Sequence, residues 1–423
     1  MSTTSVPIRT TARRIGLLVI VLIAVVANFY SGRWALANMA ASHTDIPEVA
    51  DLTTSLGPND PQTHFAAGVL YEKSFLPDDL ARSLNEYSIA ASLSPHNYLF
   101  WLDLGNARSR SGDLKGAEGA LRVAADLAPN YGSVRWALGN VLLRQGRADE
   151  AFVEIRKAGQ SEPNYALAAA DIALQYFNGN INDVREKIGE SPEIIGALID
   201  RMAAQKRLDD AVLLWNTLSS EQRSGSQQSN GKGLYTQLAA AKRFRAAAGI
   251  ETDLTPGIAS ATIAAVLNGD FESDIKLHDA SIFEWAIGDG TLPQIVLTDG
   301  KRRNGGRSLL VSFGGGDVNS FRSISQIVLV EPGKAYSFEA FSQSDIKTRA
   351  SVDWEIVDAS DGKVLATTPM VSPAADWMPL TATFTVPSTT DAVIVRLAKS
   401  ACSGQTCAVE GRVWFDDISI RAK

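Results

Sequence analysis

The chain has 423 residues, which is enough for two or three domains. Hydrophobic residues make up 45% and charged residues 21% of it, a balance that excludes wholesale disorder and a polytopic membrane protein. The net charge of −7 argues against a nucleic-acid-binding protein, because such proteins usually carry a basic surplus. Two cysteines and four histidines are too few for zinc sites of the four-cysteine or cysteine–histidine type.

Residues 15–32 form an uncharged apolar run close to the N-terminus. As a helix it would be about 27 Å long, nearly the thickness of a bilayer core. Three arginines and no acidic residue precede it, and the positive-inside rule keeps such an end in the cytoplasm. We therefore expect a cytoplasmic tail over residues 1–14 and a transmembrane anchor over 15–34.

The alternative is a signal peptide that is cleaved near Ala37, because Ala35-Leu36-Ala37 has the small-x-small pattern of a cleavage site. The anchor predicts a single-pass protein of the bacterial inner membrane, and cleavage predicts a secreted one. Both place the rest of the chain outside that membrane. Residues 35–60 are expected to be a linker.

A period of 34 residues follows. It relates Pro95, Pro129 and Pro163, and also Gly105 and Gly139, Gly112 and Gly146, Ala117 and Ala151, and Ala124 and Ala158. This pattern resembles the tetratricopeptide repeat, a stack of helix hairpins. We expect an α-solenoid of five to six helix pairs over residues 61–252.

The repeated small residues have a physical role in this prediction. Gly105 and Ala117 are expected where paired helices approach too closely for larger side chains. Gly112 and Gly146 are expected to end the first helix of each hairpin in a left-handed turn. The run 224–233, S-G-S-Q-Q-S-N-G-K-G, is predicted to be a flexible loop inside the array.

The resemblance implies a concave groove built from the first helix of each hairpin. Groove candidates are Asn106, Arg110, Trp136, Asn140 and Arg144. The two asparagines share one repeat position, at which some members of the family hold a peptide backbone; asparagine is also simply common there. The expected partners are envelope or polysaccharide-biogenesis proteins.

Residues 262–423 alternate with the period of β-strands. The clearest runs are residues 308–313, 324–330, 335–341, 351–357, 380–386, 392–398 and 412–420. Seven or more short strands in about 160 residues predict an antiparallel β-sandwich. The expected fold is thus multidomain, α then β: one membrane helix, an α-solenoid and a C-terminal sandwich.

The order of motifs narrows this prediction. The segment opens with N-G-D-F-E at 268–272 and closes with G-R-V-W-F-D-D-I-S-I at 411–420. It resembles the jelly-roll carbohydrate-binding modules of families four, nine and twenty-two, which implies a glycan ligand. The candidate glycan-binding residues are Trp354, Trp285, Trp377, Tyr336, Gln326 and Arg396. The competing interpretation places the three tryptophans in the core.

The same resemblance implies a structural calcium that ties the first strand to the last. Its expected ligands are Glu272 and Asp416 or Asp417. Strand alternation places Asp416 on the face of Ile418. Calcium needs six to eight oxygen ligands, so two carboxylates alone do not establish a site. The alternative to a calcium site is a pair of solvated acids at the end of a strand.

Cys402 and Cys407 are expected to form a disulfide, the alternatives being a redox pair or half of a metal site. The basic residues Lys301, Arg302, Arg303 and Arg307 are interpreted as a solvated hairpin tip, or alternatively as a contact for an acidic polysaccharide.

We find no nucleophile elbow, zinc-protease motif or phosphate loop, and we assign no catalytic residue. The leading hypothesis is a non-catalytic, membrane-anchored envelope protein that serves exopolysaccharide or surface-glycan assembly or export. Its repeats would bind partner proteins and its sandwich would bind glycan. The alternatives are a purely protein-binding scaffold with the sandwich as spacer, and a cryptic glycoside hydrolase.

Overall fold

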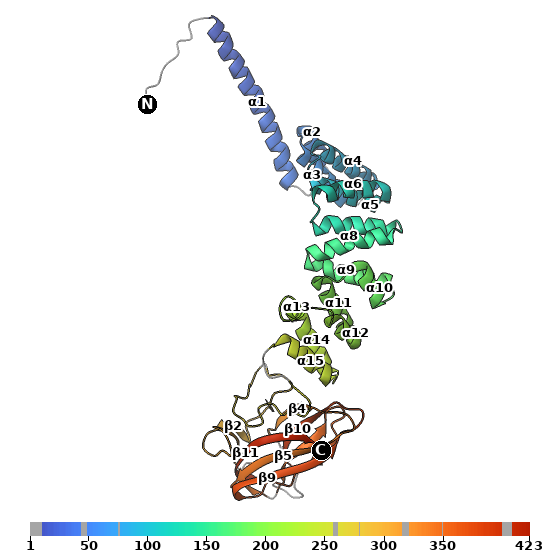
Figure 1. Ribbon diagram of the computed structural model, residues 1–423. Helices are drawn as coiled ribbons and strands as arrows, with labels where there is room; N and C mark the ends of the chain where they lie inside the picture. Colours follow the sequence, from blue (N-terminus) through green and yellow to red (C-terminus); the bar gives the residue numbers. More distant parts are fainter. Residues whose placement is uncertain are drawn as a thin grey trace, which may run out of the picture. The chain divides into compact units, whose positions relative to one another are not determined.

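The computed structural model describes residues 11–43, 49–74, 77–256, 261–278, 280–314, 321–348, 350–399 and 408–423. The chain forms two compact units, residues 1–197 and 198–423. Their division lies inside one helix of the expected solenoid. Figure 1 shows helices over the first part of the chain and strands over the last.

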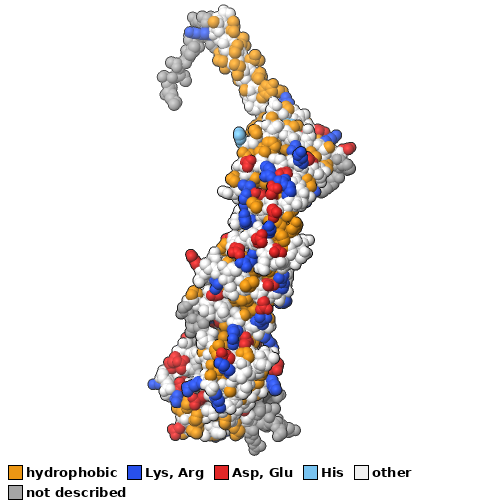
Figure 2. Space-filling model, turned by 45° about the vertical axis from the view of Figure 1, so that its right-hand side comes forward, with side chains coloured by type: hydrophobic (Ala, Val, Ile, Leu, Met, Phe, Trp, Pro, Cys, Tyr) orange, Lys and Arg blue, Asp and Glu red, His pale blue; other side chains and the backbone are white. Residues whose placement is uncertain are grey.

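The first unit begins with the long helix α1 (Thr11–His43). Its segment Thr11–Met39 has a mean hydropathy of 2.3 and is long and apolar enough to cross a membrane or to be a signal sequence. Figure 2 shows hydrophobic side chains along this helix. The helix continues into the expected linker 35–60, which also contains α2 (Ala50–Leu56), so the linker prediction is wrong.

Helix hairpins fill the rest of this unit. They are α3 (Pro61–Lys73) with α4 (Pro77–Leu93), α5 (Tyr98–Ser111) with α6 (Leu114–Leu127), α7 (Gly132–Arg144) with α8 (Ala148–Ser161), and α9 (Pro163–Tyr176) with α10 (Ile181–Ile188). The predicted tetratricopeptide-type hairpins are therefore confirmed.

The small residues act as the sequence predicts. A Cβ atom at Gly105 would lie 2.5 Å from Cγ of Leu121, so α5 and α6 pack this closely only with glycine there. Gly112 has a φ of 89° and Gly146 a φ of 78°, the left-handed conformation that ends the first helix of each hairpin.

Helix α11 (Pro192–Ala204) contains the division between the units. The second unit continues with α12 (Leu208–Trp215), α13 (Ser220–Ser224), α14 (Gln228–Ala240) and α15 (Phe244–Leu254). The flexible loop expected at 224–233 is largely helical. Ser219 caps α13, and Gly231 lies so close to the Trp215 ring that a Cβ atom would collide with it. This glycine lies within α14 and allows that helix to pack closely against Trp215 of α12.

Eleven strands form the sandwich in the described part of the chain. They are β1 (Ala286–Ile287), β2 (Gln294–Thr298), β3 (Ser308–Gly314), β4 (Ile324–Leu329), β5 (Ala335–Ser344), β6 (Lys347–Thr348), β7 (Val352–Asp358), β8 (Val364–Thr367), β9 (Ala374–Thr385), β10 (Ala392–Lys399) and β11 (Val409–Ala422). All seven predicted strands are present.

Two antiparallel sheets face each other. Sheet A has the order β1-β4-β10-β7-β8, and sheet B has the order β2-β3-β11-β5-β9, with β6 also paired to β11. One apolar core fills the space between them, with Trp354, Phe338 and Phe415 among its fully buried members. Each sheet therefore has one outer face on which a ligand can bind, and these two faces differ.

Candidate functional site

A basic segment covers part of the outer face of sheet B. We call residues 301–307 the strap. Nζ of Lys301 lies 4.0 Å from the centre of the Trp414 ring, and Cζ of Arg303 lies 3.5 Å from that of Phe341. Trp414 is consequently buried although it points out of the sheet. The predicted hairpin tip is present, because this segment joins the paired strands β2 and β3, and residues 302–306 are exposed. It is not fully solvated, however, because cation–π contacts hold the side chains of Lys301 and Arg303 against the sheet.

Carboxylates fix the strap from below. Asp416 Oδ2 accepts hydrogen bonds from the backbone N–H groups of Arg303 (2.8 Å) and Asn304 (3.3 Å). Burial raises the pKa of Asp416. Glu272 Oε1 accepts N–H bonds from Gly306 (2.8 Å) and Arg307 (3.0 Å), and these bonds lower the pKa of Glu272.

The alternation expected for Asp416 is wrong. Strand β11 carries a bulge between Asp416 and Ser419, at which Asp417 has a φ of 50°. Asp416 therefore pairs with Phe341 on the outer face, while Ile418 points into the core.

These contacts decide how well the predicted calcium ligands fit a cation. Asp416, Asp417 and Glu272 all accept bonds from N–H groups of the strap, and a calcium ion would need oxygen ligands in those positions. In the part of the chain that the structure describes, no three acidic, histidine or cysteine side chains gather as metal ligands would. The residues as arranged do not fit calcium.

The outer face of sheet A carries a polar row instead. Ser325 of β4, Arg396 of β10, Glu355 of β7 and Thr367 of β8 are paired across neighbouring strands, so their side chains point the same way. Arg396 and Glu355 form an ion pair at 2.6 Å, with 41% and 22% of their side chains exposed. The pair retains N–H groups and carboxylate oxygens that sugar hydroxyls can bind.

A buried acid lies next to this pair. Asp353 of β7 pairs with Ala398 of β10, on the same outer face. Burial raises the pKa of Asp353, and the negative charge of Glu355 adds to that shift.

Four of the six predicted glycan-binding residues lie in the interior. Trp354 and Tyr336 are 0% exposed, and Trp285 and Gln326 are 2% exposed. The prediction that these four present a surface to sugar is wrong, since each points between the sheets or is covered by the segment before β1. Gln326, for example, binds the backbone of Leu267.

The other two candidates lie at the surface on different sheets. Trp377 is half-buried on the edge strand β9, and Arg396 belongs to the polar row. Sequence reasoning missed Glu355, Trp414 and Phe341. The alternation of strand residues could have indicated Glu355, because this polar residue lies between the buried Trp354 and Ile356 and must face outward.

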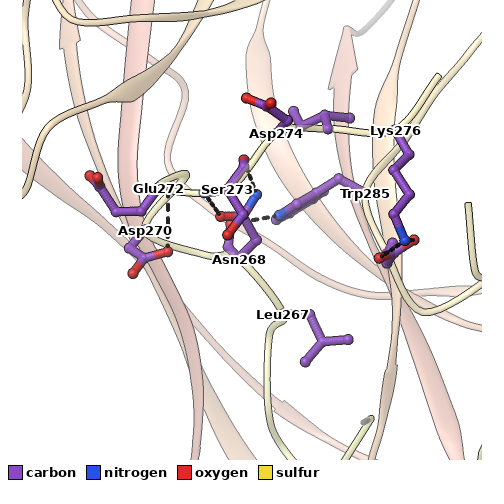
Figure 3. A pocket seen from close by; sticks show the side chains of 10 residues that line it. Leu267, Asn268, Asp270, Glu272, Ser273, Asp274, Lys276 and Trp285 are labelled. Carbon is purple, nitrogen blue, oxygen red and sulfur yellow. Dashed lines mark hydrogen bonds and ion pairs between the residues drawn. The ribbon is translucent and has the colours of Figure 1, made fainter. Parts of the chain in front are cut away.

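A hollow of about 330 Å³ lies beside the opening turn of the sandwich. Figure 3 shows Asn268 between Trp285 and Ser273, where its carbonyl accepts a bond from Nε1 of Trp285 (3.0 Å) and its side chain binds the Ser273 backbone. Lys276, on its rim, is paired with Glu284. Most polar groups that line this hollow are hydrogen-bonded to one another. We therefore interpret it as part of the structure of the opening turn and not as a ligand site.

The predicted groove residues of the repeats are also partly engaged. Arg110 is paired with Glu72 of α3, and Arg144 Nη1 donates to the Ser109 side chain of α5 (2.7 Å). Each arginine thus ties its hairpin to the preceding one.

The remaining groove candidates are half-buried. Asn140 Nδ2 donates to the Trp136 carbonyl (2.9 Å), and the Trp136 ring lies 5.6 Å from that of Tyr165. Asn106 is half-buried on α5. Cys402 and Cys407 lie outside the described residues, so the disulfide stays a prediction.

The comparisons with known proteins address the sandwich. Residues 264–404 match the family model of a carbohydrate binding domain. The predicted resemblance is therefore confirmed, and the chain is a fusion of tetratricopeptide-type repeats with a carbohydrate-binding-module-like sandwich.

Solved structures match each part. A structure described as "CBM4 structure and function" is 21% identical, with 38% of this chain and all of the other covered at a TM-score of 0.29. A crystal structure of MamA is 21% identical, with 36% of this chain and 85% of MamA covered at a TM-score of 0.31. No curated protein matches the sequence.

Proposed function

We propose that this chain is a non-catalytic, membrane-anchored envelope protein whose sandwich binds a glycan on the outer face of sheet A. The polar row centred on the Arg396–Glu355 pair carries the proposal. It crosses four strands, so a sugar chain lying across the sheet would meet several polar side chains in turn. The strap covers the corresponding part of sheet B. The match to a carbohydrate binding domain supports a sugar ligand.

The experiment is gel retention of the detergent-solubilised full-length chain by a panel of bacterial and plant polysaccharides. We expect retention by one polymer class. Arg396→Gln should weaken it at least tenfold, because the guanidinium offers five N–H donors to sugar hydroxyls and glutamine offers two. The matched control is Arg421→Gln, the same change at an exposed position of β11.

Two results would contradict this proposal. Equal retention of both variants would place the sugar elsewhere. No retention of the folded wild-type chain by any polymer would favour the alternative, a protein-binding scaffold in which the sandwich is a spacer.

The packing of α1 supports an anchor that is not cleaved. Ala37, at the possible cleavage site, is completely buried, 3.3 Å from the position of a Cβ atom at Gly57. Nε of Arg33 donates to the Leu56 carbonyl (2.9 Å), and Asn38 donates to Asp60 (3.4 Å). Cleavage near Ala37 would remove Arg33 and expose the segment around Leu56, Gly57 and Asp60, on which the C-terminal end of α1 packs.

Intact-mass measurement of the chain from bacterial membranes tests this point. We expect the mass of the uncleaved chain in the membrane fraction, with residues beyond α1 accessible to protease only from the periplasmic side. A mature protein that begins near residue 38 and is found outside the membrane would contradict it.

The repeats are proposed to bind envelope or polysaccharide-biogenesis proteins. Arg110 and Arg144 already bind the preceding hairpins. The proposed peptide contacts are therefore Asn106, the Trp136–Tyr165 pair and Asn140, whose Nδ2 would exchange its bond to the Trp136 carbonyl for one to the peptide. Together, a repeat groove and a sugar-binding face on one anchored chain would raise the local concentration of partner and glycan.

Cross-linking in cells with wild-type chain, Asn140→Ala and the control Asn182→Ala tests this role. Asn182 is an exposed residue of α10, outside the predicted groove. We expect envelope-biogenesis proteins to be captured by the wild type and the control, and lost in Asn140→Ala. Capture that is unchanged in all three would contradict a groove at Asn140.

A further inference from the structure

The acidic groups expected to hold calcium instead bind the strap. Four backbone N–H groups of the strap donate to two carboxylate oxygens. Those of Arg303 and Asn304 donate to Asp416 Oδ2, and those of Gly306 and Arg307 donate to Glu272 Oε1. Each N–H group points its positive end at a carboxylate oxygen. The four donors therefore take up the positions and the negative charge that a calcium ion would use.

Guanidinium groups of the strap also neutralise two further acids near this edge of the sandwich. Arg303 is paired with Asp417, and Arg307 Nη1 with Asp274 (2.6 Å). Arg307 also donates to the backbone carbonyl of Glu272, an oxygen of the kind that calcium would use. The two arginines therefore reach the opening turn and the last strand, the two segments that a structural calcium was expected to tie together.

The backbone is shaped for this contact. Gly305 has a φ of 62°, and a Cβ atom there would collide with the Glu272 carboxylate, so the strap approaches that closely only with glycine. Ile418 N–H donates to the Gly269 carbonyl (2.8 Å), which joins the last strand directly to the opening turn.

We propose that Arg303 and Arg307 replace the structural calcium at this edge, so that the sandwich holds its first and last strands together without a divalent cation. The inference concerns the stability of the strap and is independent of the proposed glycan site. A sandwich that binds no sugar would leave it intact.

The test is hydrogen exchange of the peptide that covers residues 299–310 in the detergent-solubilised full-length chain. We expect equal protection of the strap amides in excess calcium and in EGTA. Arg307→Gln and Arg303→Gln should each lose that protection, by at least tenfold in exchange rate, in both buffers. Arg302→Gln is the matched control, because Arg302 is exposed and, among the described residues, its guanidinium donates to the Asp299 carbonyl rather than to an acid of the opening turn or of β11.

Three outcomes would overturn the proposal: protection that appears only with calcium, calcium bound stoichiometrically to the purified wild-type chain by elemental analysis, or protection unchanged in both arginine variants. The wild-type measurements decide the question even when a variant fails to fold. Arg307→Lys, which keeps the charge and loses the fork-shaped donor set, then replaces Arg307→Gln.

Discussion

The two outer faces of the sandwich use charged residues in different ways. At sheet B, Asp416 of β11 and Glu272 of the opening turn bind the strap, and Lys301 and Arg303 lie on aromatic rings. On sheet A, Arg396 and Glu355 bind each other and stay partly exposed. In the first arrangement, the charged groups are engaged in contacts that hold a loop on the sheet. The second leaves donors and acceptors available, which is why we place the glycan there.

The largest expected effect concerns Asp416. Asp416→Ala removes the buried acceptor of the Arg303 and Asn304 amides and of the Asp417 amide, so these partly buried hydrogen bonds are lost. We expect the free energy of unfolding to fall by about 2–3 kcal/mol. Denaturant titration followed by tryptophan fluorescence measures it.

The control for this change is Asp417→Ala, whose carboxylate is partly exposed and paired with Arg303. It should cost clearly less. Equal losses for the two variants would contradict a buried acceptor at Asp416 and would weaken the contrast between the faces.

An intermediate effect is expected beneath both faces, at two neighbouring tryptophans of the core. Trp285 Nε1 donates to the Asn268 carbonyl, whereas Trp354 Nε1 is buried without a partner in the described structure. Trp285→Phe should therefore cost about 1 kcal/mol more than Trp354→Phe, because only the first loses a hydrogen bond. Urea unfolding of both variants measures the difference; the reverse order would contradict the assigned contacts.

A smaller effect depends on pH and has opposite signs on the two sides. The pKa of Asp353, on sheet A, is raised by burial and by Glu355, so its ionisation destabilises the fold. Burial also acts to raise the pKa of Asp345, beside sheet B, but the hydrogen bonds and charge of Arg412 hold it below its usual value.

Linkage gives the direction of each change. Relative to Asp353→Asn, the wild type should lose stability as the pH rises from about 4 through the raised pKa of Asp353. Relative to Asp345→Asn, its stability should be present above about pH 4 and should fall as the pH drops through the lowered pKa of Asp345. Unfolding free energies between pH 3 and pH 7 measure both, and slopes of the same sign would contradict the comparison.

Much of the fold could be predicted from the sequence because its signals are periodic. The 34-residue spacing fixes the hairpins from α5 to α9, and the left-handed Gly112 and Gly146 fix their turns. The run 224–233 has the composition of a loop although most of it is helical, because glycine at a tight helix contact and glycine in a flexible segment look alike in the sequence. Only the approach of Gly231 to Trp215 distinguishes them.

The candidate site was less predictable for a related reason. One bulge at Asp417 reverses the strand alternation, so the facing of Asp416 could not be read from parity. The position of the strap depends on pairing between residues more than a hundred positions apart, such as Arg303 and Asp416. The sequence indicates Arg396 directly and, by strand parity, an outward-facing Glu355, whereas the pairing of these two residues depends on the register of β7 and β10.

The most direct test of the open face is the affinity of the full-length chain for the polysaccharide that retains it, compared among wild type, Arg396→Gln and Arg421→Gln. We expect Arg396→Gln to weaken binding at least tenfold, about 1.4 kcal/mol, while Arg421→Gln binds as the wild type does. Unchanged binding by Arg396→Gln, or a loss confined to Arg421→Gln, would contradict the assignment of the glycan to sheet A.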